Sequence, residues 1–134
     1  MIGAIGLAAC GGSARALEPA VSMAPMSDMP MQVQAAPVVV QQAYRFAAVN
    51  PELMKQIPCY CGCGAIGHTS NYACYVSGML ETTKLEFDAH ALACGICVDI
   101  TQDAMRLSGQ GKSPGDIRAY VDLTYSKFGP SNMR

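Results

Sequence analysis

The strongest constraint on this chain is the hexapeptide Pro58-Cys59-Tyr60-Cys61-Gly62-Cys63, in which three thiols stand at alternate positions. Side chains at i, i+2 and i+4 of an extended segment point to the same side, so these three thiols can face one point. The proline stiffens the entry, and glycines at 62, 64 and 67 let the following loop turn tightly. The six thiols that we expect at one soft-metal site are Cys59, Cys61, Cys63, Cys74, Cys94 and Cys97.

The cysteine count is far above average usage for a chain of this size. Seven cysteines occur in 134 residues, a length typical of one small domain. Such a density indicates disulfides or metal binding rather than a packed apolar core. The net charge is −1 and the nine basic residues are scattered, so nothing predicts nucleic-acid binding.

The first ten residues predict a lipid anchor. Residues 1–9 are apolar, and Leu7-Ala8-Ala9-Cys10 is followed by Gly-Gly-Ser, which resembles a bacterial lipobox with cleavage before Cys10. We interpret 1–9 as the C-terminal part of a lipoprotein signal peptide. It contains no Lys or Arg, so we expect the true start to lie upstream. The predicted location is extracytoplasmic, with acyl chains on Cys10 holding the protein to the bacterial membrane, in the periplasm or at the cell surface.

Residues 10–37 are predicted to be the lipid attachment point and a disordered tether. From 11 to 37 the chain is rich in Ala, Pro and Ser and has no aromatic residue, so it has little apolar surface to bury. Thioethers are soft ligands that suit Cu(I), which favours a weak auxiliary copper site in this tract. The alternative is that unbranched methionine is simply tolerated in a flexible segment. The four methionines concerned are Met23, Met26, Met29 and Met31.

A Cys-rich helical domain is expected over 38–134. Apolar residues recur at helical spacing between 40 and 47. Asn50 and Pro51 are typical of a helix start, and that short helix should end before Pro58. One or two helical turns within 71–78 would carry Cys74, and residues 79–87 are expected to be a loop or a short extended piece.

Two longer helices complete the expected fold. Asp88 can cap a helix running to about Ser108, with His90 and the two last cysteines on one inward face. The final helix has the clearest signals, since Ser113 is a cap, a proline follows it, and Asp116 takes the capping-box position. Its apolar stripe is Ile117, Tyr120, Val121, Thr124, Tyr125 and Phe128. The predicted fold class is all-α, a small bundle of four to five helices with an irregular Cys-rich metal-binding loop.

The favoured chemistry for the thiols is Cu(I) binding. Soft thiolates select Cu(I), Zn(II) and iron–sulfur clusters, and six thiolates exceed what one tetrahedral ion needs. The excess favours a small polynuclear Cu(I) cluster, or transfer between alternative thiol sets. His90 is a candidate further ligand, with a surface or core histidine as the alternative. His68 is interpreted chiefly as a loop histidine and only as a weak auxiliary ligand.

Three other interpretations remain open. A structural Zn(II) site would use Cys94-x2-Cys97 with two thiols of the hexapeptide. Structural disulfides would pair the six cysteines that remain after lipidation of Cys10, in one of 15 ways. A thiol oxidoreductase based on Cys94 and Cys97 is disfavoured, because the pair is expected inside a helix and not at its N-terminus. The chain shows no nucleophile–base pair, paired carboxylates or phosphate loop, so we do not expect an enzyme.

The hexapeptide also carries a resemblance. With Gly67-His68, Asn71, Cys74, the run from His90 to Cys97 and Ile117-Arg118, the chain resembles the bacterial PCYCGC-motif lipoproteins over roughly residues 42–128, together with the lipobox. The resemblance implies a membrane-tethered, Cys-rich, extracytoplasmic domain and brings no settled activity. The copper hypothesis therefore rests on ligand chemistry. Its expected role is capture, buffering or delivery of Cu(I), with a copper transporter, chaperone or oxidase assembly factor as a possible partner.

Overall fold

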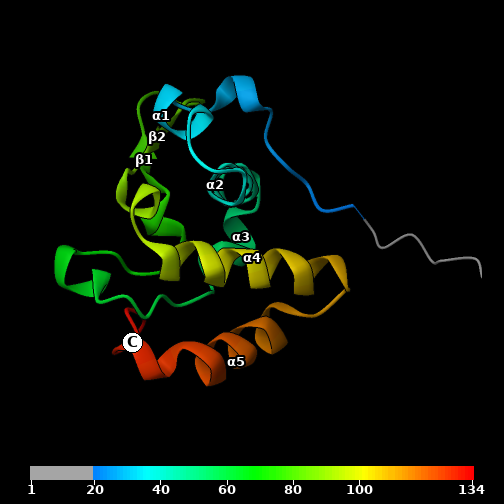
Figure 1. The fold of residues 1–134 in the computed structure, drawn as a ribbon, viewed down its shortest axis with the longest axis vertical. Coiled ribbons are helices and arrows are strands. Elements are labelled where there is room, and N and C mark those ends of the chain that lie inside the picture. The colour runs from blue at the N-terminus through cyan, green and yellow to red at the C-terminus, as the bar shows by residue number, and fades with distance from the viewer. Residues whose placement is uncertain (1–19) are drawn as a thin grey trace, which may run out of the picture.

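The computed structural model describes residues 20–134, so Cys10 and the predicted signal segment lie outside the described residues. Helix α4 (Gly95–Gly109) crosses the middle of the molecule. Helix α2 (Val38–Val49) packs on one side of it and helix α5 (Pro114–Tyr125) on the other (Figure 1). Two single-turn helices, α1 (Met31–Gln34) and α3 (Pro51–Met54), flank α2. None of the helices in residues 20–134 has the length and apolar character needed to span a membrane.

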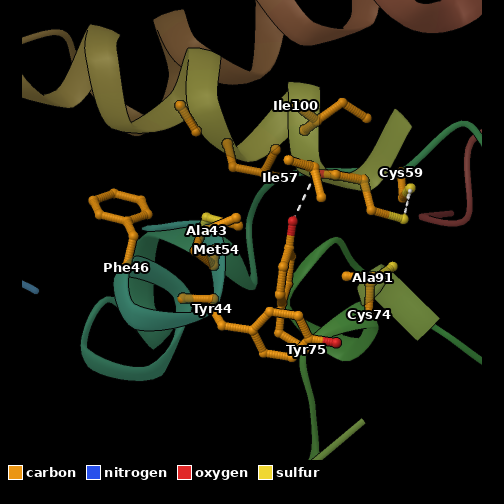
Figure 2. Close-up of a cluster of buried hydrophobic side chains, with 14 of the residues drawn as sticks. Ala43, Tyr44, Phe46, Met54, Ile57, Cys59, Cys74, Tyr75, Ala91 and Ile100 are labelled. Carbon is orange, nitrogen blue, oxygen red and sulfur yellow. Dashed lines mark hydrogen bonds between the residues drawn. The ribbon is translucent and has the colours of Figure 1, made fainter. Parts of the chain in front are cut away.

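The core lies where α2, α3 and α4 meet the Cys-rich loop, the segment that begins with the hexapeptide at 58–63. Figure 2 shows that Cys59 and Cys74 belong to the same buried cluster as Phe46, Met54 and Ile57. All five of these side chains are fully buried. These two cysteines are therefore part of the apolar core and do not lie on the surface. The close packing of the core holds their thiols in place.

Helices α2 and α5 confirm the pattern-based predictions, except that Phe128, expected on the apolar stripe of the last helix, is exposed in a 3₁₀ turn beyond α5. The apolar positions between 40 and 47 are buried in α2. In α5 the hydroxyl of Ser113 accepts a hydrogen bond from the Asp116 backbone N–H at 3.2 Å, as the capping signal predicted. Asn50 and Pro51 begin α3 as predicted, with Asn50 at the N-cap position, although the Asn50 side chain makes no cap hydrogen bond and its amide nitrogen donates to the Phe46 and Ser22 carbonyls.

The molecule is mostly helical but not purely all-α, which corrects the predicted fold class. Strands β1 (Val76–Met79) and β2 (Leu85–Phe87) form an antiparallel hairpin with a register irregularity between Val76 and Gly78. The strands are only four and three residues long and are partly exposed. Such short strands leave no period-two run to detect, so the sequence pattern indicated helical turns within 71–78 and a loop or a short extended piece over 79–87. The helical turn is limited to Tyr72–Cys74, and β1 follows it.

The predicted long helix from Asp88 to Ser108 is also corrected. The Asp88 carboxylate accepts a hydrogen bond from the backbone N–H of His90 at 2.7 Å, and only a short 3₁₀ turn, His90–Leu92, follows. The chain is then extended at Cys94 (φ −114°, ψ 98°), and α4 begins at Gly95. The expectation that Cys94 and Cys97 lie inside a helix was therefore wrong, because Cys94 is the N-cap of α4 and Cys97 lies in its first turn. The helical periodicity did not reveal this break, because residues 88–108 contain no proline and the break lies between small residues.

Residues 20–37 are not the disordered tether that composition predicted. They form a 3₁₀ turn at Met26–Asp28 and helix α1, and they dock on α2. The Ala24 N–H donates to the Arg45 carbonyl at 3.0 Å, and Arg45 Nε donates back to the Ala24 carbonyl at 2.6 Å. Met29 and Val33 are 4% and 1% exposed. The segment needs no core of its own, because it buries these few apolar side chains on a surface that α2 already provides.

Candidate metal centre

The Cys-rich loop owes its shape to two glycines. Gly62 and Gly67 have left-handed backbones (φ +86° and +93°) on either side of a 3₁₀ turn from Cys63 to Ile66. Residues other than glycine rarely adopt this backbone conformation. The two turns fold the loop back, so that the thiols of Cys59, Cys61 and Cys63 lie within 4.8 Å of one another. The convergence expected from the alternating spacing is therefore present.

The beginning of α4 brings the second group of thiols to this loop. Cys97 is fully buried, and its Sγ lies 3.4 Å from Cys59 Sγ and 3.6 Å from Cys61 Sγ. The break before α4 turns Cys94 toward Cys97, with 3.3 Å between the two sulfur atoms. His90 Nε2 lies 3.4 Å from Cys61 Sγ. A four-ligand set results, in which Cys97 is buried and the other three members are half-buried: Cys61, His90, Cys94 and Cys97.

A second four-ligand set lies beside the first. Cys63 and Cys74, both buried, have their sulfur atoms 3.7 Å apart. The rings of His68 and His90 meet edge to face, with centroids 5.0 Å apart. These two thiols and two imidazoles offer ligand atoms within 4.8 Å of one another. His90 belongs to both sets, and Cys59 joins them through a further buried group with Cys74 and Cys97.

The spacing between these atoms suits metal coordination. Bonds of about 2.3 Å from a tetrahedral ion to its thiolates place the sulfur atoms about 3.8 Å apart. The shortest sulfur–sulfur distances in the cluster are 3.3–3.7 Å. A disulfide needs about 2.05 Å. All six cysteines of residues 20–134 are free thiols in this structure, at separations that a small adjustment converts into a metal-bound arrangement.

One thiol of the cluster is favoured as a thiolate. Hydrogen bonds from the thiols of Cys74 and Cys97 hold the pKa of Cys59 well below its ordinary value, against the effect of burial. The pKa of Cys97 is raised, first by its hydrogen bond to Cys59 and further by burial. A second negative charge so close to the first is unfavourable without a cation. The metal-free cluster therefore retains protons that a bound metal ion would displace.

His68 has a position that the sequence did not reveal. Its Nε2 lies 3.5 Å from the Asp88 carboxylate, and its side chain is 11% exposed. Its Nδ1 is buried and has no hydrogen-bond partner. The interpretation chiefly as a loop histidine fits poorly, because a buried ring nitrogen without a partner is costly. The missed signal was Asp88, which the sequence indicated only as a helix cap.

A buried polar network supports the backbone at Cys97. Tyr75 Oη donates to the Cys97 carbonyl at 2.8 Å. Thr101 Oγ1 lies 2.7 Å from both Tyr75 Oη and Asn71 Nδ2. The Asn71 backbone N–H donates to the Ile57 carbonyl at 2.7 Å, just before the hexapeptide. The network thus connects both thiol-bearing segments, and it is not apparent from sequence spacing alone.

The C-terminal residues close the Cys-rich loop. Asn132 Oδ1 accepts a hydrogen bond from the Cys59 N–H at 2.7 Å, and its backbone N–H donates to the Cys59 carbonyl at 3.1 Å. Its Nδ2 donates to Cys63 Sγ at 3.5 Å. Tyr60 Oη, from the same loop, donates to Asp122 of α5 at 2.6 Å. Asn132 therefore pairs with the loop backbone much as a neighbouring strand would, and it contacts one candidate ligand directly.

The methionine tract contributes to packing. Met29 is buried, and Met23 and Met26 pack partly buried against the core, whereas Met31 is 80% exposed. Met29 also lines a pocket of about 720 Å³ between the N-terminal segment and the β-hairpin. The residues that line this pocket include no cysteine or histidine. The auxiliary copper site stays a prediction.

The fold and the cluster define a cysteine-rich, mostly helical domain whose thiols and imidazoles can hold metal. The chain belongs to the family described as "Protein of unknown function with PCYCGC motif", whose model matches residues 18–131. Comparison with curated proteins and with solved structures finds no significant match. The family resemblance of the hexapeptide is confirmed. The matched region also includes the segment that docks on α2, so that segment belongs with the domain.

Proposed function

We propose that the protein binds Cu(I) in a polynuclear thiolate centre and serves to capture, buffer or deliver it. The observation that supports this most is the surplus of ligands. Six thiols and two imidazoles fall into overlapping sets that share Cys97, Cys59 and His90. One tetrahedral ion needs four ligands, and a shared thiolate is what joins neighbouring ions in a cluster.

The overlap between sets also suits metal transfer. An ion held by one set can acquire a ligand of the next before it loses its own, so no bare intermediate is required. Cys61 and Cys94 are half-buried, whereas Cys59, Cys74 and Cys97 are fully buried. The half-buried thiols are therefore the natural point of exchange with a donor or acceptor, and the buried thiols protect the ion that has entered.

We further propose that this centre works outside the cytoplasm, tethered through acyl chains on Cys10. The lipobox-like sequence supports the anchor. A copper transporter, a copper chaperone or an oxidase assembly factor is the expected class of partner, because a membrane-held Cu(I) carrier has to exchange its ion with such proteins. Metabolic labelling with a fatty acid tests the anchor, since label should enter the native chain and not the Cys10→Ser variant.

Native mass spectrometry tests the copper centre. The full chain with Cys10→Ser, reduced without oxygen, is offered Cu(I) and Zn(II) together. We expect two or more Cu(I) ions per chain, and fewer in Cys97→Ser, because Cys97 takes part in two of the overlapping sets. Ser77→Ala is a matched control, since Ser77 is exposed and belongs to none of the sets. A chain that holds no Cu(I) under these conditions contradicts the proposal.

A single structural Zn(II) is the second candidate. It is favoured by one observation, the closed set of three thiols and one imidazole formed by Cys61, His90, Cys94 and Cys97. Structural zinc sites use four such ligands. In the same experiment, one Zn(II) that excess Cu(I) cannot displace, with no Cu(I) uptake, would favour this candidate and remove the copper role.

A further inference from the structure

We infer that Cys63, His68, Cys74 and His90 form a separate site for a divalent cation of the Zn(II) class, beside a thiolate-only Cu(I) site. The inference deepens the proposed function, because it divides the ligands of that centre between two kinds of metal. Eight ligands make two complete sets of four. Once the two histidines join Cys63 and Cys74, four thiols remain, and all four are linked by sulfur–sulfur distances of 3.3–3.6 Å: Cys59, Cys61, Cys94 and Cys97.

The first argument is the unpartnered nitrogen of His68. Its Nε2 faces the Asp88 carboxylate at 3.5 Å, so the ring proton belongs there. The lone pair then lies on Nδ1, which is buried and has no hydrogen-bond partner. His68 offers one of its ring nitrogens to the group with Cys63, Cys74 and His90. A metal ion among these atoms would supply the missing partner.

The second argument is the way Asp88 is held. One carboxylate oxygen faces His68 Nε2, and the other accepts a hydrogen bond from the backbone N–H of His90 at 2.7 Å. The Asp88 carbonyl accepts from Tyr44 Oη at 2.7 Å, and its N–H donates to the Tyr75 carbonyl at 2.8 Å. One fixed residue thus orients the His68 imidazole and holds the backbone of His90. Metal-bound histidines regularly donate their second N–H to a carboxylate, which fixes the tautomer and makes the ring a better ligand.

The third argument concerns metal preference. Two thiolates and two imidazoles in tetrahedral array are a typical Zn(II) ligand set, whereas an all-thiolate set is better suited to soft Cu(I). Cys63 and Cys74 are buried, and Asn132 donates to the Cys63 sulfur. The mixed site connects the loop, the turn at Tyr72–Cys74 and the turn at His90–Leu92. A divalent ion there would hold these three segments together beside the Cu(I) site.

The experiment loads the reduced full chain, with Cys10→Ser, first with one equivalent of Zn(II) and then with Cu(I). Native mass spectrometry should show both metals on one chain. X-ray absorption at the zinc edge should show two sulfur and two nitrogen neighbours. Three sulfurs and one nitrogen would place zinc in the Cys61, His90, Cys94 and Cys97 set and overturn the inference, as would four sulfurs. This measurement needs no further variant, so it does not depend on whether a variant of the site folds.

Variants give a second, independent test. His68→Ala should abolish retention of Zn(II), and Asp88→Asn should weaken Zn(II) binding about 10- to 100-fold, while the Cu(I) count of both stays unchanged. Cys94→Ser is the matched opposite, with Cu(I) weakened and Zn(II) retained. Unchanged Zn(II) affinity in His68→Ala overturns the inference. Zn(II) bound with two nitrogens but no Cu(I) uptake would refute the copper proposal and leave this one standing.

Discussion

Asn132 illustrates how much one residue outside the cysteine motif contributes to the site. It makes two hydrogen bonds with the backbone of Cys59 and one with the sulfur of Cys63. The first two fix the course of the loop, and the third favours the charged form of a ligand, because an N–H group that points at sulfur stabilises a thiolate. The two roles use different atoms of the same residue and can be separated.

The substitution Asn132→Asp separates them. It keeps the oxygen that accepts the Cys59 N–H and replaces the donor to Cys63 with a second carboxylate oxygen. We expect the Zn(II) affinity to fall roughly 10-fold or more, because a charged hydrogen bond of about 1.5–3 kcal/mol is lost. The unfolding free energy of the metal-free protein should change little by comparison. Competition with a chelator and urea unfolding measure the two quantities.

Asn132→Ala is the matched comparison, because it removes the side-chain contact with the Cys59 N–H as well and should lower both the affinity and the metal-free stability. Unaltered metal affinity in the Asn132→Asp variant would show that the contact at 3.5 Å does not affect the ligand.

At the scale of elements, the clearest local sequence signal is the N-terminal cap of α5, and the structure contains the expected cap. The hydroxyl of Ser113 accepts from the Asp116 N–H and donates to the Asp116 carboxylate at 2.7 Å. These hydrogen bonds hold the pKa of Asp116 below its ordinary value of 3.8. Because the folded-state pKa is lowered, the stabilisation from this carboxylate is present above the unfolded value. It is lost as the pH falls through the folded one.

The substitution Ser113→Ala should lower the unfolding free energy by about 1 kcal/mol, the usual cost of losing an N-cap. Asp116→Asn should be less stable than the native chain near neutral pH, and the difference should disappear in acid. Urea unfolding of metal-free protein at several pH values checks both effects. A stability difference for Asp116→Asn that persists in strong acid would mean that the carboxylate charge is not its cause.

Elements also show where sequence patterns stop being informative. The cap of α5 and the apolar face of α2 involve residues three or four apart, so local patterns were enough to predict them. The break at Cys94 depends on that thiol meeting the Cys-rich loop, 33 residues earlier at Cys61, and no local signal records it. The strands of the hairpin are too short to show alternation, and the rings of Tyr75 and Phe87 beside them both pack against Tyr44 of α2, far away in the sequence.

At the scale of the whole molecule, the sequence allowed the thiol ligands of the candidate centre to be predicted. It did not allow prediction of the residues and segments that hold those ligands in place. The spacing of the cysteines indicated that six thiols converge, since three of them alternate and two others are three residues apart. His68 was undervalued because its partner Asp88 is 20 residues away in the chain. The composition of residues 20–37 predicted disorder, because a compositional argument considers a segment alone and not the surface it meets.

The thiols are candidate metal ligands, and some of them are also part of the buried core. We therefore expect substitutions of Cys74 and Cys94 to affect stability differently. Cys74 is fully buried, so Cys74→Ser places a hydroxyl in an apolar site and should destabilise even the metal-free protein by about 1–3 kcal/mol. Cys94 is half-buried, so Cys94→Ser should leave the metal-free stability within about 0.5 kcal/mol. It should nevertheless lower the melting temperature of the Cu(I)-loaded protein, since bound metal stabilises more strongly the higher its affinity.

Thermal unfolding with and without Cu(I) distinguishes the two variants. Equal losses in the loaded and metal-free forms of Cys94→Ser would assign that thiol to packing or to a disulfide rather than to metal.

The long separation between the Cys-rich loop and Asn132 bears on the order of events as the chain is made. The hexapeptide leaves the ribosome before α4 supplies Cys94 and Cys97, and well before Asn132, which is 73 residues beyond Cys59. Contacts this distant form late. During that interval the nascent chain exposes four thiols without their partners, which makes it vulnerable to oxidation and to mismatched metals. We therefore expect the correct metal to bind after synthesis is complete. The contacts of the C-terminal residues with the Cys-rich loop should be the last part of the site to form.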